Sequence, residues 1–198
     1  DHAAALGAEV VIADGLLQSA PERLAASVLV LDARAPFGAG ACPPLGDLRA
    51  PVDALLAAST VRAVITEDAP PHPLPAPLKD AILVQSTIAT ASAPGEPPRA
   101  LATLRGQRVG LLLTVARPER IVTSLRPHGI TPSPVLALAD HAAPSERDLA
   151  EISSISVDVW LTTGRCAVKL PPRLAGAPIL ALDHQLDIGV LADRMHGI

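Results

Sequence analysis

The sequence predicts an α/β fold, with a parallel sheet in the first part of the chain and a smaller α/β domain after it. Three observations support this prediction. Short apolar runs alternate with helix-like segments, the runs are mostly continuous in their apolar character, and a proline-rich stretch separates them into two groups. Continuously apolar strands are typical of a parallel sheet covered on both faces, and the alternation of strand and helix favours the α/β class. The length of 198 residues and the apolar content of 49% suit one large or two small packed domains.

Eight short runs rich in Val, Ile, Leu or Ala are the expected strands. They are Glu9–Ile12, Val28–Leu31, Val61–Thr66, Ala81–Val84, Arg108–Leu113, Val135–Leu138, Val157–Thr163 and Ile179–Leu182.

Helix signals stand between these runs. The segment 118–125 begins with proline, which suits a first helical turn, and Gly129 lies near the expected end of the helix. The segment 145–155 begins with a serine followed three residues later by an aspartate, a pattern that resembles a capping box. Leu186–Met195 is the expected final helix.

A proline-rich segment at residues 69–99 interrupts this rhythm. Proline removes a backbone donor and fixes φ, so we expect loops or extended chain around one strand. The expected domains are therefore 1–68 and 100–198, joined by this connector. A polyproline ligand for another protein is the alternative, and a plain linker is the expected case.

Composition excludes several classes of function. A formal charge of −4 and a content of one Phe, one Trp and no Tyr argue against nucleic-acid binding. Cys42 and Cys166 lie far apart, whereas a zinc site needs about four clustered ligands, so we expect two free thiols. No apolar run reaches the roughly 18 residues that span a bilayer, so we expect no transmembrane segment in this chain. The chain starts at Asp1 rather than Met, which indicates a cut or trimmed product.

The first candidate site residue is Asp14, which follows the apolar run Glu9–Ile12. P-loop enzymes place a carboxylate near Mg²⁺ in this way, at the carboxyl end of a strand. A turn at Asp14 and Gly15 with no ligand is the alternative interpretation.

The second candidate is the segment Phe37–Pro51. Gly38 and Gly40 flank one residue and allow the backbone to approach a ligand closely, and Arg49 can pair with a phosphate. A glycine-rich surface loop with a solvated arginine is the alternative.

Three further segments stand at the ends of expected strands: Thr114–Arg120 opens a helix, Asp140 and His141 form an acid–histidine pair, and Leu161–Leu170 carries Lys169. Free amides at a helix start can bind an anion, and an acid–histidine pair can orient a catalytic group. The alternative interpretation of each segment is an ordinary strand or helix boundary, or a surface residue, without a ligand.

Taken in order, these segments resemble the motifs of the tetraacyldisaccharide 4'-kinase (lipid A 4'-kinase) family. That family carries DDGxQH, FGNGxxLPxGPLREP, GIGNPERF, FPDHHxY and TEKDAVKL, where x is any residue. The counterparts here are ADGLLQS, FGAGACPPLGDLRAP, TVARPERI, LADHAAP and TTGRCAVKL. The second and fifth are the most specific, because each keeps several fixed residues, and the resemblance runs from about Gly7 to about Leu182.

The resemblance implies a P-loop-NTPase-like fold and transfer of the γ-phosphate of ATP, with Mg²⁺, to the 4'-hydroxyl of a lipid A disaccharide precursor. It also implies a peripheral position at the cytoplasmic surface of the bacterial inner membrane. The implied site residues are Asp14 near Mg²⁺, Arg49, Gly38 and Gly40 near substrate or nucleotide phosphates, and His141 and Asp140 as catalytic residues. In the family that histidine orients a catalytic aspartate, which would precede residue 1, so a missing N-terminal half is an implied partner.

Many departures from the family motifs fall on polar positions, while glycines and prolines are largely kept. The replacing residues are Ala13, Ser19, Ala39, Ala50, Ala142, Gly164, Arg165 and Cys166. Because the lost groups are those that would meet ligands, the pattern indicates a retained fold with weakened chemistry.

The phosphate-binding pattern G-x-x-x-x-G-K-[ST] is absent from the 198 residues. Phosphoryl transfer depends on that loop, its lysine and Mg²⁺, so we expect this chain alone to be inactive. Three hypotheses remain open: the later part of a kinase, a pseudokinase that acts as a binding or scaffold module, and an unrelated α/β module.

Overall fold

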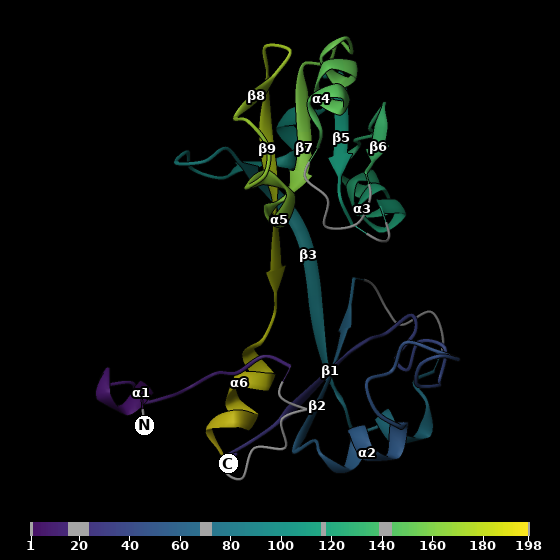
Figure 1. Cartoon of the computed structure of the whole chain (residues 1–198), viewed down its shortest axis with the longest axis vertical. Helices are drawn as coiled ribbons and strands as arrows, with labels where there is room; N and C mark the ends of the chain where they lie inside the picture. Colours follow the sequence, from purple (N-terminus) through teal and green to yellow (C-terminus); the bar gives the residue numbers. More distant parts are fainter. Residues whose placement is uncertain (1, 16–23, 68–72, 116–117, 139–143, 198) are drawn as a thin grey trace. The chain divides into compact units, whose positions relative to one another are not determined.

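The structure is a computed structural model that describes residues 2–15, 24–67, 73–115, 118–138 and 144–197. The chain divides into two compact units. The first unit comprises Asp1–Gln85 and Asp187–Ile198, and the second comprises Ser86–Leu186 (Figure 1). Helices alternate with mostly parallel strands in both, which confirms the predicted α/β class.

The first unit is built on three parallel strands. Its elements are α1 (His2–Ala5), β1 (Val28–Asp32), α2 (Val52–Ala57), β2 (Val61–Thr66), η2 (Ala76–Leu78), the start of β3 (Ile82–Ser92) and α6 (Gly189–His196). β1 pairs with β2, and β2 pairs with β3. One face of this sheet packs into a small core of Leu31, Ala33, Val64 and Leu78.

The second unit is built on a larger sheet in the strand order β3-β9-β7-β5-β6. Its elements after β3 are β4 (Arg99–Ala100), η3 (Leu101–Leu104), β5 (Val109–Leu113), α3 (Pro118–Leu125), η4 (Arg126–His128), β6 (Val135–Ala137), α4 (Glu146–Ser153), β7 (Val159–Thr163), α5 (Gly164–Ala167), β8 (Arg173–Leu174) and β9 (Ala177–Leu186). The strands β6, β5, β7 and β9 run parallel to one another, and β3 and β8 run antiparallel to β9.

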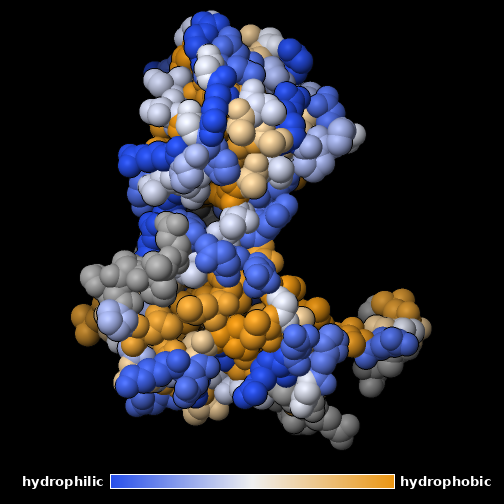
Figure 2. Space-filling view, turned by 180° about the vertical axis from the view of Figure 1, so that it is seen from behind, coloured by the Kyte–Doolittle hydropathy of each residue, from blue (hydrophilic) through white to orange (hydrophobic). Residues whose placement is uncertain are grey.

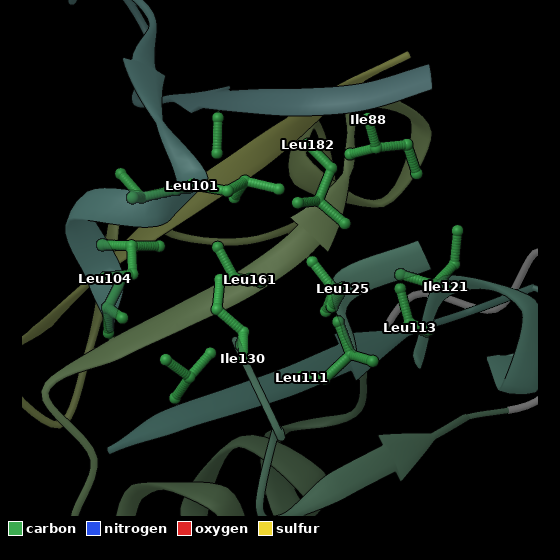
Figure 3. Close-up of a cluster of buried hydrophobic side chains, with 14 residues drawn as sticks. Ile88, Leu101, Leu104, Leu111, Leu113, Ile121, Leu125, Ile130, Leu161 and Leu182 are labelled. Atoms are coloured by element: carbon green, nitrogen blue, oxygen red, sulfur yellow. The ribbon is translucent and has the colours of Figure 1, made fainter. Parts of the chain in front are cut away.

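Two apolar clusters cover the two faces of this larger sheet. One joins Leu111 and Leu161 to Leu125 of α3 and to η3 (Figure 3). The other joins Trp160 to Ile152 of α4. Successive residues of a strand point to opposite faces, so coverage of both faces buries every residue of β5 and β7. This explains why β5 and the first three residues of β7 are apolar in sequence, whereas the buried end of β7 consists of Thr162 and Thr163.

Most of the predicted elements are present. β2 and α3 have the predicted bounds, and α4 begins with the expected capping box of Ser145 and Asp148, although it ends at Ser153. β3 is longer than the predicted strand because it continues along β9. Pairing also carries β9 to Leu186, so the final helix begins only at Gly189.

The predicted strand Glu9–Ile12 is wrong. These residues form no strand, and Val10, Val11 and Ile12 are 76%, 68% and 93% exposed. A strand exists only through hydrogen bonds to a neighbour, and none of the strands in the described ranges pairs with this segment.

The proposed division at 1–68, 69–99 and 100–198 stays a prediction. The strand expected in its middle segment is β3.

Candidate functional site

The candidate site is the loop from Ala33 to Pro51, which connects β1 to α2. It begins at the carboxyl end of a parallel strand, the position at which open α/β sheets bind ligands. The structure therefore places three of the predicted residues, Gly38, Gly40 and Arg49, in one loop beyond a strand end.

The first half of the loop is a pair of tight turns. The amide of Gly38 donates to the carbonyl of Ala35 at 3.1 Å, and that of Gly40 donates to the carbonyl of Phe37 at 2.7 Å. Both glycines have positive φ, 50° and 74°, a region that other residues rarely adopt. The side chain of Phe37 packs against the core of the first unit and anchors these turns. The glycines are thus required by the backbone itself.

The second half of the loop folds back on the first. The amide of Leu48 donates to the carbonyl of Ala41 at 3.0 Å. A Cβ at Gly46 would lie 2.8 Å from the carbonyl carbon of Ala41 and nearer still to its oxygen, so only glycine fits this approach. Asp47 then faces the glycine turns, and its carboxylate accepts a hydrogen bond from the amide of Ala39 at 3.2 Å. Arg49 lies two residues beyond Asp47 and is exposed.

Three charged residues that the sequence did not reveal connect the ends of β1 and β2 at the start of this loop. Arg34 pairs with Glu67 at 3.1 Å, and the amide of Arg34 donates to the carboxylate of Asp32 at 3.0 Å. The side-chain amide of Gln85 donates to the backbone carbonyl of Glu67. The signal that could have revealed this group is an acidic residue at or directly after the end of two neighbouring strands.

Asp14 lies in the exposed segment before β1, in a bend next to Gly15, whose φ is 72°. Because the predicted strand before it is absent, Asp14 does not stand at a strand end. Within the described ranges, no group of three His, Cys, Asp or Glu side chains is arranged to hold a metal ion. The role of Asp14 near Mg²⁺ therefore stays a prediction.

Asp140 and His141 lie outside the described residues, and their catalytic roles stay predictions. The fifth motif lies at the end of β7 and in α5, where Cys166 is buried. The Sγ of Cys166 accepts hydrogen bonds from the amide of Thr114 at 3.3 Å and from the hydroxyl of Thr163 at 3.1 Å. Burial raises the pKa of the Cys166 thiol, but the hydrogen bonds from the threonines outweigh this effect and lower the pKa below its usual value.

None of the helices that the structure describes is both long enough and apolar enough to cross a bilayer.

The comparisons with known proteins agree with one another. The family model described as tetraacyldisaccharide-1-P 4'-kinase matches residues 1–196. The tetraacyldisaccharide 4'-kinase of Gluconobacter oxydans is 31% identical over 175 residues, covering 83% of this chain and 49% of the relative. That of Syntrophotalea carbinolica is 36% identical over 171 residues, covering 83% of this chain and 47% of the relative. The chain thus spans about half the length of these relatives.

A solved structure has a similar fold. The crystal structure of the "apo" form of LpxK from Aquifex aeolicus in complex with ATP superposes with a TM-score of 0.58 at 14% sequence identity. The match covers 86% of this chain and 51% of that one. At this identity the likeness concerns the fold.

Proposed function

Because this chain belongs to the tetraacyldisaccharide 4'-kinase family, we propose that it forms the later part of such a kinase. The whole enzyme transfers the γ-phosphate of ATP, with Mg²⁺, to the 4'-hydroxyl of a lipid A disaccharide precursor in lipopolysaccharide biosynthesis. It works as a peripheral protein at the cytoplasmic surface of the bacterial inner membrane. The observation that carries this proposal is the family match over residues 1–196.

In this proposal the loop after β1 faces the phosphates. Gly38 and Gly40 bring the backbone close, and Arg49 supplies the positive charge. Asp14 belongs to the Mg²⁺ environment, and Asp140 and His141 belong to the catalytic group. The position of the loop beyond the carboxyl end of β1 supports its part of this assignment.

The phosphate-binding loop itself comes, in this proposal, from a further segment that corresponds to the other half of the relatives. The 198 residues lack the pattern G-x-x-x-x-G-K-[ST], and the relatives are about twice as long as the matched region. Exposed apolar side chains of the first unit, including Val10, Val11, Ile12 and Val30, suit contact with such a segment. Figure 2 shows apolar residues gathered on one face of this unit. Alone, the chain is inactive.

The second candidate is a pseudokinase that binds a partner and transfers no phosphate. It rests on the replacement of polar motif positions by Ala13, Ala39, Ala50 and Gly164, because these residues cannot contact a metal ion or a phosphate through a polar side chain.

The test is a phosphoryl-transfer assay with ATP, Mg²⁺ and tetraacyldisaccharide 1-phosphate. We expect no product from the chain alone and product when a loop-bearing segment from a relative is supplied with it. Transfer by the chain alone would contradict the proposed dependence. If the complementing segment binds and still no product forms, the pseudokinase is favoured.

A further inference from the structure

The glycine turns of the loop after β1 offer few backbone donors to a ligand. Of the amides of Gly38, Ala39 and Gly40, the first and third donate to carbonyl groups within their own turns. The amide of Ala39 is directed differently: it donates to Oδ1 of Asp47 at 3.2 Å. A ligand oxyanion that binds this short stretch must therefore compete for the Ala39 amide.

The carboxylate of Asp47 also fills the space beside Gly38. A Cβ at Gly38 would lie 2.7 Å from Oδ2 of Asp47, 2.9 Å from its Cγ and nearer still to Oδ1. The absence of a side chain at Gly38 thus admits a negatively charged group, and that group belongs to the chain itself. At Gly40, by contrast, a Cβ would meet nothing within 4 Å.

The closure of the loop fixes this contact. The hydrogen bond from Leu48 to Ala41 and the close approach of Gly46 to Ala41 return the chain so that Asp47 faces Gly38. Asp47 stands where the family pattern quoted above has proline, a residue that carries no charge.

From these contacts we propose that Asp47 is an internal anion that occupies the anion position of this loop and must leave before a phosphate group can bind there. This rests on the proposed function in one respect, namely that the loop meets phosphates. A carboxylate and a phosphate repel each other, and both require the same amide. Asp47 therefore orders the empty loop and lowers its affinity for phosphate.

Two substitutions separate the charge from the hydrogen bond. Asp47→Asn removes the charge and keeps a neutral acceptor for the Ala39 amide, whereas Asp47→Ala removes both. Asp53→Asn is the matched control, because it removes another exposed acidic group just beyond the loop, in the first turn of α2.

The experiment is a titration of the ¹⁵N-labelled chain with inorganic phosphate, read at the amide resonance of Ala39. We expect the affinity for phosphate to rise about fivefold in Asp47→Asn, the effect of removing one like charge at a few Å in water, and further in Asp47→Ala. Asp53→Asn should bind phosphate as the unchanged chain does. Before phosphate is added, Asp47→Ala should already shift the Ala39 resonance.

Equal phosphate affinity in all four proteins, or an Ala39 resonance that responds to neither substitution nor phosphate, would overturn the proposal. The transfer assay with the complementing segment tests the proposed function separately. Phosphate binding that is strengthened by Asp47→Ala, together with no product in the complemented transfer assay, would leave the internal anion established and favour the pseudokinase.

Discussion

The two units use the same kind of strand but cover it differently. In the second unit, β5 and β7 are buried along their whole length by clusters on both faces of the sheet. In the first unit, β1 buries Leu31 on one face, while Val28 and Val30 are 36% and 55% exposed. The second unit thus carries its own complete core. The first unit holds the glycine loop on a sheet whose strands are less fully covered.

The largest expected effect lies in the core of the second unit. Leu161→Ala should reduce the free energy of unfolding by about 2–5 kcal/mol, because Leu161 is fully buried between β5 and η3 and its loss leaves a cavity. Urea unfolding followed by the fluorescence of the single Trp reports on this unit. Val168→Ala, at a side chain 83% exposed in the same unit, is the control and should change little. Equal effects of both substitutions would contradict a self-sufficient core.

A second prediction concerns the contact between β5 and β7. Gly110 pairs with Trp160 across the two strands, and a Cβ at Gly110 would lie 2.5 Å from two carbons of the indole ring. Gly110→Ala should therefore cost about 1–3 kcal/mol through overpacking. Gly164→Ala meets nothing within 4 Å and lies in α5, so it should be neutral or slightly stabilising. The two melting temperatures, compared by circular dichroism, check this; a stable Gly110→Ala protein would show that the ring can move.

The third prediction uses pH. The pKa of Cys166 is lowered in the folded chain, so the folded state releases its proton at lower pH than the unfolded state. The contribution of the Cys166 thiol to the free energy of unfolding is fully present above the pKa of the unfolded thiol, about 8.5. This contribution is lost as the pH falls through the pKa of the thiol in the folded chain. The stability of the unchanged chain relative to Cys166→Ser should therefore increase between pH 7 and pH 9.5. Urea titrations at both pH values test this, and a pH-independent difference would contradict it.

The smallest effect is expected on the open face of the first unit. Val30→Ser should change the free energy of unfolding by no more than about 0.5 kcal/mol, since the side chain is already 55% exposed. Thermal unfolding of the chain measures this. A loss above about 1 kcal/mol would be typical of a buried site and would remove the contrast between the two units.

Local sequence signals predicted the parts of the fold that depend on local physics. The strands β2 and β5 and the capping box of Ser145 were identified correctly, because burial of a strand and capping of a helix leave a pattern in adjacent residues. Glu9–Ile12 has the same pattern and forms no strand, because strand formation depends on a partner elsewhere in the chain.

The candidate site was predictable to a similar degree. Gly38 and Gly40 stand out in the sequence because their backbone requires glycine. The pairing of Arg34 with Glu67 and the contact of Asp47 with Ala39 join residues 33 and eight positions apart, and neither leaves a pattern in the sequence. Such contacts are determined by how the strands and the loop fold together, so the structure was needed to find them.

The open edge of β1 has a further consequence. Among the described strands β1 pairs with β2 alone, so one row of its backbone amides and carbonyls is left without a strand partner. Edge strands of this kind promote aggregation, and proteins usually protect them with lysine, proline or a bulge. The sequence of β1, Val-Leu-Val-Leu-Asp, contains no lysine or proline, and its pairing with β2 contains no bulge. Its only charged residue is the final aspartate. At high concentration the chain on its own should therefore self-associate edge to edge, and a segment that covers β1 would act as its solubility factor.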